Sequence, residues 1–190
     1  MLPGGNTPFT IYRLIRDNPP KIDNRLHIML SDERYVPPFS ADSNFGRMGS
    51  MFSALKISAT RVFHPDCELP LKECAEKYNL NLSNYLENGG IITLALLGVG
   101  IDGHTASLFD HNSLTRGKQA CAIAVKRDDG PDRISVTKNL ISRIKRIVFL
   151  CAGVEKAGIV EKMEQNPNGV IAARAVENVE NVELWYSALT

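Results

Sequence analysis

The sequence predicts an α/β fold built on a mainly parallel sheet, and three observations support this. Short apolar segments alternate along the chain with segments of helical periodicity, the pattern of strand–helix units. Residues 91–97 (IITLALL) are almost continuously apolar, as in a parallel strand covered on both faces. A chain of 190 residues with 44% hydrophobic and 23% charged residues has the size and composition of one folded domain. We therefore expect residues 1–190 to form a single domain.

The expected elements follow one another closely along the chain. Thr7 followed by Pro8 is typical of an N-cap and the first helical position, and Asn18-Pro19-Pro20 ends that helix. Residues 26–30 (LHIML) predict a short buried strand, and the charged, proline-containing residues 31–43 predict a long loop. Further helices are expected at residues 44–55, 70–87 and 154–165, and further strands at residues 61–63, 120–125, 133–137, 146–151 and 182–186.

Charge and hydropathy exclude several classes of protein. The chain has 22 Lys+Arg and 21 Asp+Glu, a net charge of +1 without a basic block, so we expect no nucleic-acid partner. No apolar run approaches the roughly 18 to 20 residues of a membrane helix, and the first residues do not have the pattern of a secretory signal. The four cysteines are better explained as reduced thiols than as a disulfide framework. We therefore expect a cytoplasmic protein without membrane contact.

The stretch with the strongest candidates for catalytic residues directly follows the apolar segment 91–97. Gly98, Gly100 and Gly103 satisfy the dinucleotide pattern GxGxxG, but no helix of several turns with an apolar stripe follows them, which disfavours a nicotinamide cofactor. Asp102 and His104 lie in the same loop, at the carboxyl end of a predicted strand, where open α/β sheets bind ligands. Histidine suits general base chemistry near neutral pH, and a neighbouring carboxylate can orient its ring. A structural histidine is the alternative, but this position favours a catalytic pair.

Three further segments supply candidate anion ligands. Gly4-Gly5-Asn6-Thr7 precedes the first helix, whose N-terminus offers unpaired N–H groups to an anion. Ser31-Asp32-Glu33-Arg34 follows the strand at residues 26–30, and Arg133 and Lys156 lie near other strand ends. Each segment alone is also explained by an ordinary helix start or a solvated surface charge.

Two other kinds of site are disfavoured. Cys67 and Cys74 lie near His64, but their spacing fits no common zinc pattern, so we expect no metal. The GxSxG nucleophile elbow of many serine hydrolases is absent from the sequence.

Taken together, these segments resemble the 6-phosphogluconolactonase family. The matching stretches are PGGNTP (residues 3–8), SDERYVPPFSADSN (31–44) and LLGVGIDGHTASLF (96–109), with weaker support from DRISVT (132–137) and AGVEKA (152–157). The resemblance implies a Rossmann-like α/β fold shared with glucosamine-6-phosphate deaminases. It also implies hydrolysis of 6-phosphoglucono-1,5-lactone in the oxidative pentose phosphate pathway, with a small phosphosugar lactone as substrate and no metal or organic cofactor.

The resemblance also implies roles for individual residues. His104 would be the base that activates water, with Asp102 beside it. The phosphate end of the substrate would be held by Gly4, Gly5, Asn6, Thr7, Arg34, Arg133 and Lys156.

This chain departs from the family at several of its motif positions. The glycine loop usually begins Ser-Gly-Gly-Ser-Thr, and Pro3 and Asn6 replace the two serines here. Pro3 removes a hydroxyl and a backbone N–H, which puts phosphate affinity in question. Thr93 replaces the usual aspartate before the strand.

Two competing functions remain open. A glucosamine-6-phosphate deaminase shares the DGH turn, but that family places a glutamate after its histidine, whereas residues 105–110 here are TASLFD. A non-catalytic phosphosugar-binding or regulatory protein would keep the phosphate ligands and lose His104, which is present.

The glycine loop lies unusually near the start of this sequence. In the family it follows a first helix and a parallel strand, which would take on the order of 30 residues. Relative to that pattern the fold is N-terminally shortened, so we expect a neighbouring strand with an uncovered edge. We expect another chain, as in a homo-oligomer, or a rearranged element to cover it.

Overall fold

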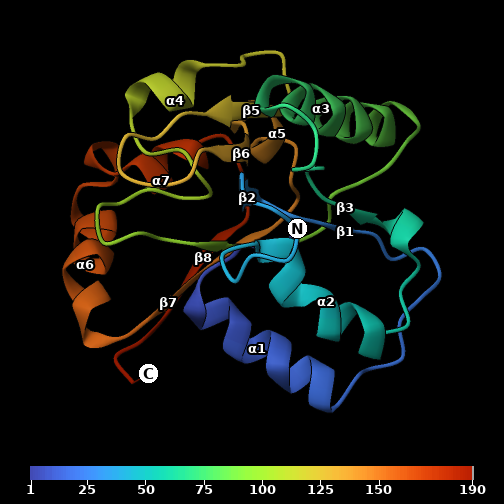
Figure 1. Cartoon of the computed structure of the whole chain (residues 1–190). Helices are drawn as coiled ribbons and strands as arrows, with labels where there is room; N and C mark the ends of the chain where they lie inside the picture. The colour runs from blue at the N-terminus through green and yellow to red at the C-terminus, as the bar shows by residue number, and fades with distance from the viewer. Residues whose placement is uncertain (190) are drawn as a thin grey trace.

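The computed structural model describes residues 1–189 and is built around parallel strands. β4 (Ala95–Gly98), β7 (Ile147–Ala152) and β8 (Val182–Ser187) form one parallel sheet in the order β4-β7-β8. β1 (Ile28–Met29) and β3 (Val62–Phe63) form a second parallel pair. Figure 1 shows these strands running through the middle of the molecule. The predicted α/β class with a mainly parallel sheet is confirmed.

Met1 and Leu2 join these two parallel sheets. Leu2 forms a parallel bridge with Leu30; its N–H donates to the Met29 carbonyl at 2.8 Å, and its carbonyl accepts from Ser31 at 2.9 Å. On the other side, the Leu96 N–H donates to the Met1 carbonyl at 3.0 Å. Met1 and Leu2 therefore lie between β1 and β4 and connect the two sheets.

A separate antiparallel sheet, absent from the sequence-based expectation, has the order β2-β6-β5. It consists of β2 (Asp32–Arg34), β6 (Arg133–Val136) and β5 (Ala122–Val125). The prediction of a loop over residues 31–43 was wrong at its start. The charged residues Asp32–Arg34 adopt an extended conformation because β6 supplies a hydrogen-bonding partner for their backbone. A local sequence pattern does not reveal such a distant partner.

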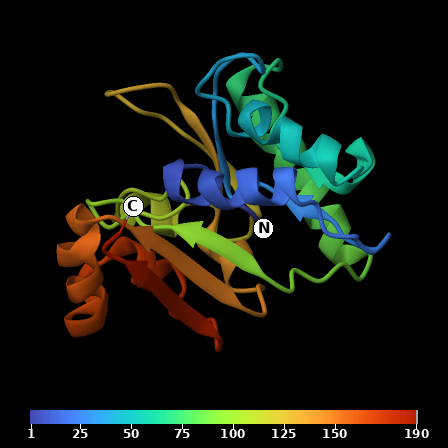
Figure 2. The same cartoon turned by 90° about the horizontal axis from the view of Figure 1, so that it is seen from below.

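Helices cover both faces of the parallel sheet. α1 (Asn6–Asp17) and α2 (Asn44–Ala54) pack together on one side, and α3 (Leu71–Glu87) and the antiparallel sheet lie on the other (Figure 1). Figure 2 shows α1 lying across β4 and β7. The remaining helices are α4 (His111–Thr115), α5 (Lys138–Ile141), α6 (Ala157–Gln165) and α7 (Ile171–Ala175), with 3-10 turns at η1 (Ala59–Arg61), η2 (Val154–Lys156) and η3 (Pro167–Gly169).

Two element boundaries differ from expectation in ways that matter for the site. α1 starts with Gly5 at its N-cap, not Thr7, and no side chain caps it, so the first N–H groups of the helix stay free. β4 begins at Ala95, so residues 91–94 precede the strand although their sequence is apolar.

The apolar side chains form two cores that follow this layering. The larger core contains Tyr78, Leu97 and Phe149 and lies between the parallel sheet, α3 and the C-terminal helices. The smaller one, around Phe9 and Met48, lies between α1, α2 and β1. The loops at the carboxyl ends of β4 and β1 are thus held on two rigid layers.

Candidate active site

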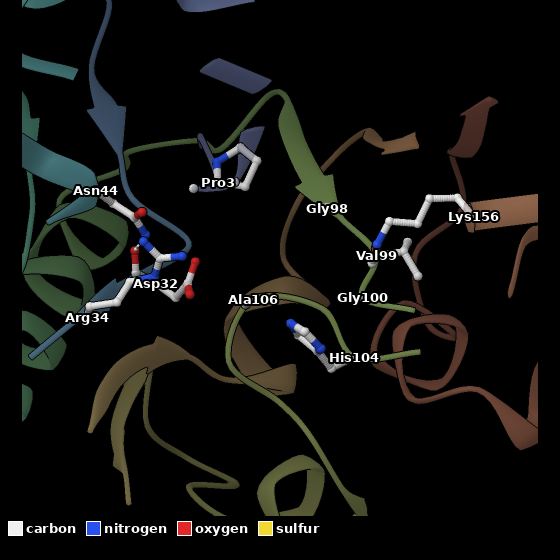
Figure 3. Close-up of a pocket in the computed structure, with 12 residues that line it drawn as sticks. Pro3, Asp32, Arg34, Asn44, Gly98, Val99, Gly100, His104, Ala106 and Lys156 are labelled. Atoms are coloured by element: carbon white, nitrogen blue, oxygen red, sulfur yellow. Dashed lines mark hydrogen bonds between the residues drawn. The ribbon is translucent and has the colours of Figure 1, made fainter. Parts of the chain in front are cut away.

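A pocket of about 220 Å³ opens at the carboxyl end of β4. Its walls come from the segment before α1, from β2, from the start of α2, from the loop after β4 and from η2 (Figure 3). Segments far apart in the sequence therefore meet at one sheet edge, as expected for a ligand site in an α/β fold.

The pocket brings together only part of the predicted site. Its lining includes Gly4, Gly5, Arg34, His104 and Lys156. The predicted residues outside the lining are Asn6, Thr7, Asp102 and Arg133.

His104 and Asp102 form a directly hydrogen-bonded pair. His104 Nδ1 lies 2.5 Å from Asp102 Oδ1, and the His104 backbone N–H donates to the same oxygen at 3.2 Å. A carboxylate only accepts hydrogen bonds, so Nδ1 carries the proton and Nε2 remains available as a base. Partial burial would raise the pKa of Asp102, but the hydrogen bonds from His104 outweigh it and lower that pKa. The carboxylate is thus charged and fixes the imidazole.

The glycines of this loop make the pair possible. A Cβ at Gly100 would lie 2.2 Å from His104 Nδ1 and 2.3 Å from Asp102 Oδ1, so any side chain there would displace the pair. Gly103 has φ +87°, a conformation that other residues rarely adopt. The Thr105 hydroxyl donates to the Gly98 carbonyl at 2.8 Å and closes the turn. The glycine pattern therefore serves a tight strand-end turn.

The segment before α1 presents free donors to the other end of the pocket. Within residues 1–189, the backbone N–H groups of Gly4, Gly5, Asn6 and Thr7 have no hydrogen-bond acceptor. Gly5 has φ +96°, and the Tyr12 hydroxyl donates to the Pro3 carbonyl at 2.9 Å, which anchors this turn. Free N–H groups at a helix N-terminus favour an anion. Asn6 and Thr7 can thus contribute through their backbone while their side chains lie outside the lining.

Two cations reach the pocket. The Arg34 guanidinium is held by the Asp42 carbonyl at 2.9 Å, and Lys156 Nζ donates to the Val99 carbonyl at 2.7 Å. Neither has a carboxylate partner among the ion pairs of the described chain. Figure 3 shows them on opposite sides of the pocket. Both keep their charge available for an anionic ligand.

Arg133 occupies a supporting position. It is the register partner of Arg34 in the β2–β6 ladder, and its guanidinium donates to the Pro131 carbonyl. Burial, followed by the charge of Arg34, lowers the pKa of Arg133. Its charge therefore adds to the positive field beside Arg34.

Glu33 supports the wall of the pocket in a way that the sequence did not reveal. Its side chain is 1% exposed and accepts backbone N–H bonds from Arg34, Asn44 and Phe45, each at 2.7 Å. Burial raises the pKa of Glu33, and these hydrogen bonds act against the rise. Glu33 thereby fixes the start of α2 against β2. A buried glutamate that accepts from the backbone looks, in the sequence, like any surface charge.

Asp32 and Asn44 complete the wall beside Arg34. Asp32 accepts from the Ser31 hydroxyl at 2.9 Å and from the Ser107 hydroxyl at 2.8 Å, which ties β2 to the His104 loop. Asn44 Nδ2 donates to the Asp32 carbonyl at 3.0 Å, and a Cβ on Gly4 would lie 2.1 Å from Asn44 Oδ1. Gly4 must therefore be a glycine for the two segments to meet.

Comparison with protein families agrees with this arrangement. Residues 1–185 match the model of the family described as glucosamine-6-phosphate isomerases/6-phosphogluconolactonase. The chain belongs to this family. The motif resemblance seen in the sequence is thus confirmed, as is the fold that it implied.

Several relatives that are similar to this chain are named 6-phosphogluconolactonase. The chain is 32% identical over 191 residues to the 6-phosphogluconolactonase of Haemophilus influenzae, covering 97% of this chain and 82% of that protein. It is 35% identical over 145 residues to the human 6-phosphogluconolactonase, covering 72% of this chain and 56% of that protein. The crystal structure of 6-phosphogluconolactonase from Thermotoga maritima superimposes with a TM-score of 0.84 at 30% identity, covering 97% of this chain and 82% of that one.

The other branch of the family shares the fold. A monomeric glucosamine-6-phosphate deaminase matches with a TM-score of 0.77 at 20% identity, over 97% of this chain and 84% of that one. At this identity the match establishes architecture alone.

Residues 1–189 contain no group of three or more His, Cys, Asp or Glu side chains placed to hold a metal ion. No helix in the same part of the chain combines the length and apolar character needed to cross a membrane.

Proposed function

We infer that this chain hydrolyses 6-phospho-D-glucono-1,5-lactone to 6-phosphogluconate, a step of the oxidative pentose phosphate pathway. The main support for this function is that a single pocket has two chemically distinct ends. One end holds the His104–Asp102 pair, and the other holds Arg34 and the free N–H groups before α1. A neutral lactone carbonyl suits the first end, and a phosphate dianion suits the second.

The proposed reaction uses His104 as general base. Nε2 takes a proton from water as the water oxygen attacks the lactone carbonyl carbon, and the resulting imidazolium is stabilised by Asp102. The tetrahedral intermediate collapses by breaking the bond between that carbon and the ring oxygen. The ring oxygen then takes the proton from His104 and leaves as a hydroxyl group, which regenerates the base. No cofactor is needed in this sequence of steps.

The proposed phosphate site combines main-chain and side-chain donors. Gly4, Gly5, Asn6 and Thr7 supply N–H groups at the positive end of α1. Arg34 supplies a cation at this end of the pocket, with Arg133 beside it on the neighbouring strand, and Lys156 supplies a second cation at the opposite wall (Figure 3). The Tyr12 hydroxyl donates to the Pro3 carbonyl and holds the segment whose following residues donate.

Measurement of lactone disappearance tests this function. Purified protein should consume 6-phosphogluconolactone faster than the spontaneous rate, and the excess should persist in EDTA. Ammonia release from glucosamine 6-phosphate, without lactone hydrolysis, would instead assign the chain to the deaminase branch. Binding of 6-phosphogluconate with no acceleration of either reaction would identify a regulatory phosphosugar-binding protein. Because phosphorylated sugars are retained in cells, the proposed place of action is the cytoplasm.

A further inference from the structure

The residues that follow His104 fold back and bring a second ring against its imidazole. The Leu108 N–H donates to the Thr105 carbonyl at 2.9 Å, and these two residues form an antiparallel bridge. In an antiparallel pair the next residues outward also face each other, which places Phe109 opposite His104. The centroids of the two rings lie 4.6 Å apart, and their planes meet at 45°. Phe109 therefore packs directly on the candidate general base.

The turn between these two rings is held by its surroundings. Ala106 has φ +49°, a left-handed conformation that a residue with a side chain rarely adopts. Such a conformation persists where the surrounding structure enforces it. Ser107 supplies this constraint, because it is 1% exposed and its N–H donates to the Ser135 hydroxyl oxygen at 3.1 Å. The buried part of the turn thus sets where Phe109 lies.

The imidazole of His104 needs a second restraint besides Asp102. The hydrogen bond from Nδ1 to Asp102 fixes one edge of the ring, while Nε2 lies on the far edge. The terminal torsion of a histidine side chain has a broad energy minimum, so the plane of the ring is only weakly fixed by this bond. A reacting group that is misplaced by about 1 Å can lose on the order of a hundredfold in rate. Packing against Phe109 restrains the plane.

Arg127, in the loop between β5 and β6, holds the Phe109 ring in turn. Its guanidinium carbon lies 3.8 Å from the centroid of that ring, which is a cation–π contact. The guanidinium donates to Asp129 Oδ2 at 2.6 Å, and the Arg127 backbone N–H donates to Asp132 Oδ1 at 2.9 Å. The side chain of Arg127 is only 24% exposed. The β5–β6 loop thus fixes the guanidinium over the ring.

We propose that Phe109 is a positioning residue for His104 and that Arg127 keeps Phe109 in place. This role rests on the proposed function, in which His104 is the general base. Both residues lie outside the lining of the candidate active site, so they act through the imidazole and not on the substrate. Asp102 fixes the edge of the imidazole and Phe109 fixes its plane, which directs Nε2 to one point in the pocket.

Nuclear magnetic resonance of the full chain with ¹³C-labelled histidine tests the contact independently of activity. The ring of Phe109 shifts the signals of the His104 ring protons that lie near it. These signals are assigned among the four histidines by their loss in His104→Gln. They should move in Phe109→Leu and stay close to wild type in Phe109→Tyr, which keeps the ring. Arg127→Gln should move them less, because the ring remains but loses the guanidinium that fixes it.

Arg47 provides a matched control for Arg127. Its guanidinium carbon lies 3.7 Å from the centroid of the Phe9 ring, so the same kind of contact joins α2 to α1. Arg47→Gln should leave the His104 signals unchanged. Circular dichroism checks that each variant is folded.

Lactone kinetics give the second readout. A positioning residue acts on the chemical step, so Phe109→Leu should lower kcat roughly tenfold with KM unchanged. Phe109→Tyr should restore kcat to within about twofold of wild type, and Arg127→Gln should lower it roughly threefold. If the wild-type protein does not hydrolyse the lactone, the proposed function fails, and the histidine signals still decide whether Phe109 sets the position of His104.

Three outcomes would overturn the proposal. They are His104 signals in a folded Phe109→Leu protein that match wild type, a raised KM with unchanged kcat in that variant, and equal displacement of the His104 signals by Arg127→Gln and Arg47→Gln. The second outcome would place Phe109 in substrate binding. The third would show that the imidazole responds to the loss of a distant cation–π contact as much as to that of Arg127.

Discussion

The residues that precede β4 and those that follow it differ in composition and in geometry. At the carboxyl end, glycines turn the chain tightly, and Nδ1 of His104 lies 2.5 Å from Oδ1 of Asp102. At the amino end, the apolar side chains of Ile91 and Leu94 are exposed. The contrast teaches that the glycines and polar side chains that follow β4, and not the apolar residues that precede it, build the candidate active site.

One short segment connects these two regions. Met1 and Leu2 pair with β4 and β1, and Gly4 and Gly5 line the candidate active site. The predictions below test the candidate active site and its connection to this segment.

At the active-site end, Glu33→Ala should be strongly destabilising. The variant leaves the buried N–H groups of Asn44 and Phe45 without their acceptor, at an expected cost of about 3 kcal/mol in the free energy of unfolding. The start of α2 and Arg34 would also move, so lactone turnover should fall. Glu73→Ala, at an exposed position of α3, is the control and should change stability by less than about 0.5 kcal/mol. Equal stability of the two variants would rule out this role for Glu33.

The connection between the segments is tested by Gly4→Ala. Its Cβ would lie 2.1 Å from Asn44 Oδ1, so we expect a loss of about 2 kcal/mol and a raised KM for the phosphosugar. Adding Asn44→Ala should restore part of the stability, because the clashing atoms are removed. Gly130→Ala, with no atom within 4 Å of the new Cβ, is the control. If the double variant is no more stable than Gly4→Ala, the contact is not the cause.

The smallest predicted effect is that of Asp102→Asn. The amide keeps the size of the side chain but loses the charge that fixes Nδ1 of His104, so kcat should fall by roughly tenfold or more with little change in KM. Asp128→Asn, at an exposed position, should behave as wild type. A raised KM with unchanged kcat would place Asp102 in substrate binding.

Sequence patterns predicted the parts of the fold that depend on local signals. The helix expected at residues 70–87 corresponds to α3 at Leu71–Glu87, and the strand expected at residues 146–151 corresponds to β7 at Ile147–Ala152 in the sheet core. The meeting of His104 and Arg34 at one pocket followed from their positions after strands. Such features need only periodicity and strand order.

The features missed depend on distant partners. β2 is a strand because β6 pairs with it, and Glu33 is buried because α2 begins against it. Residues 91–94 are mostly apolar but precede β4. Arg133 is the register partner of Arg34 on the neighbouring strand and lies outside the pocket lining. None of these relationships leaves a local mark in the sequence.

The most direct test of the central claim is the kcat/KM of His104→Ala with 6-phosphogluconolactone. We predict a fall of roughly a hundredfold to ten-thousandfold, with the fold intact by circular dichroism. His111→Ala, on α4 and outside the pocket lining, should keep the wild-type value. A folded His104→Ala protein with wild-type kcat/KM would show that another group activates the water, and would contradict the account.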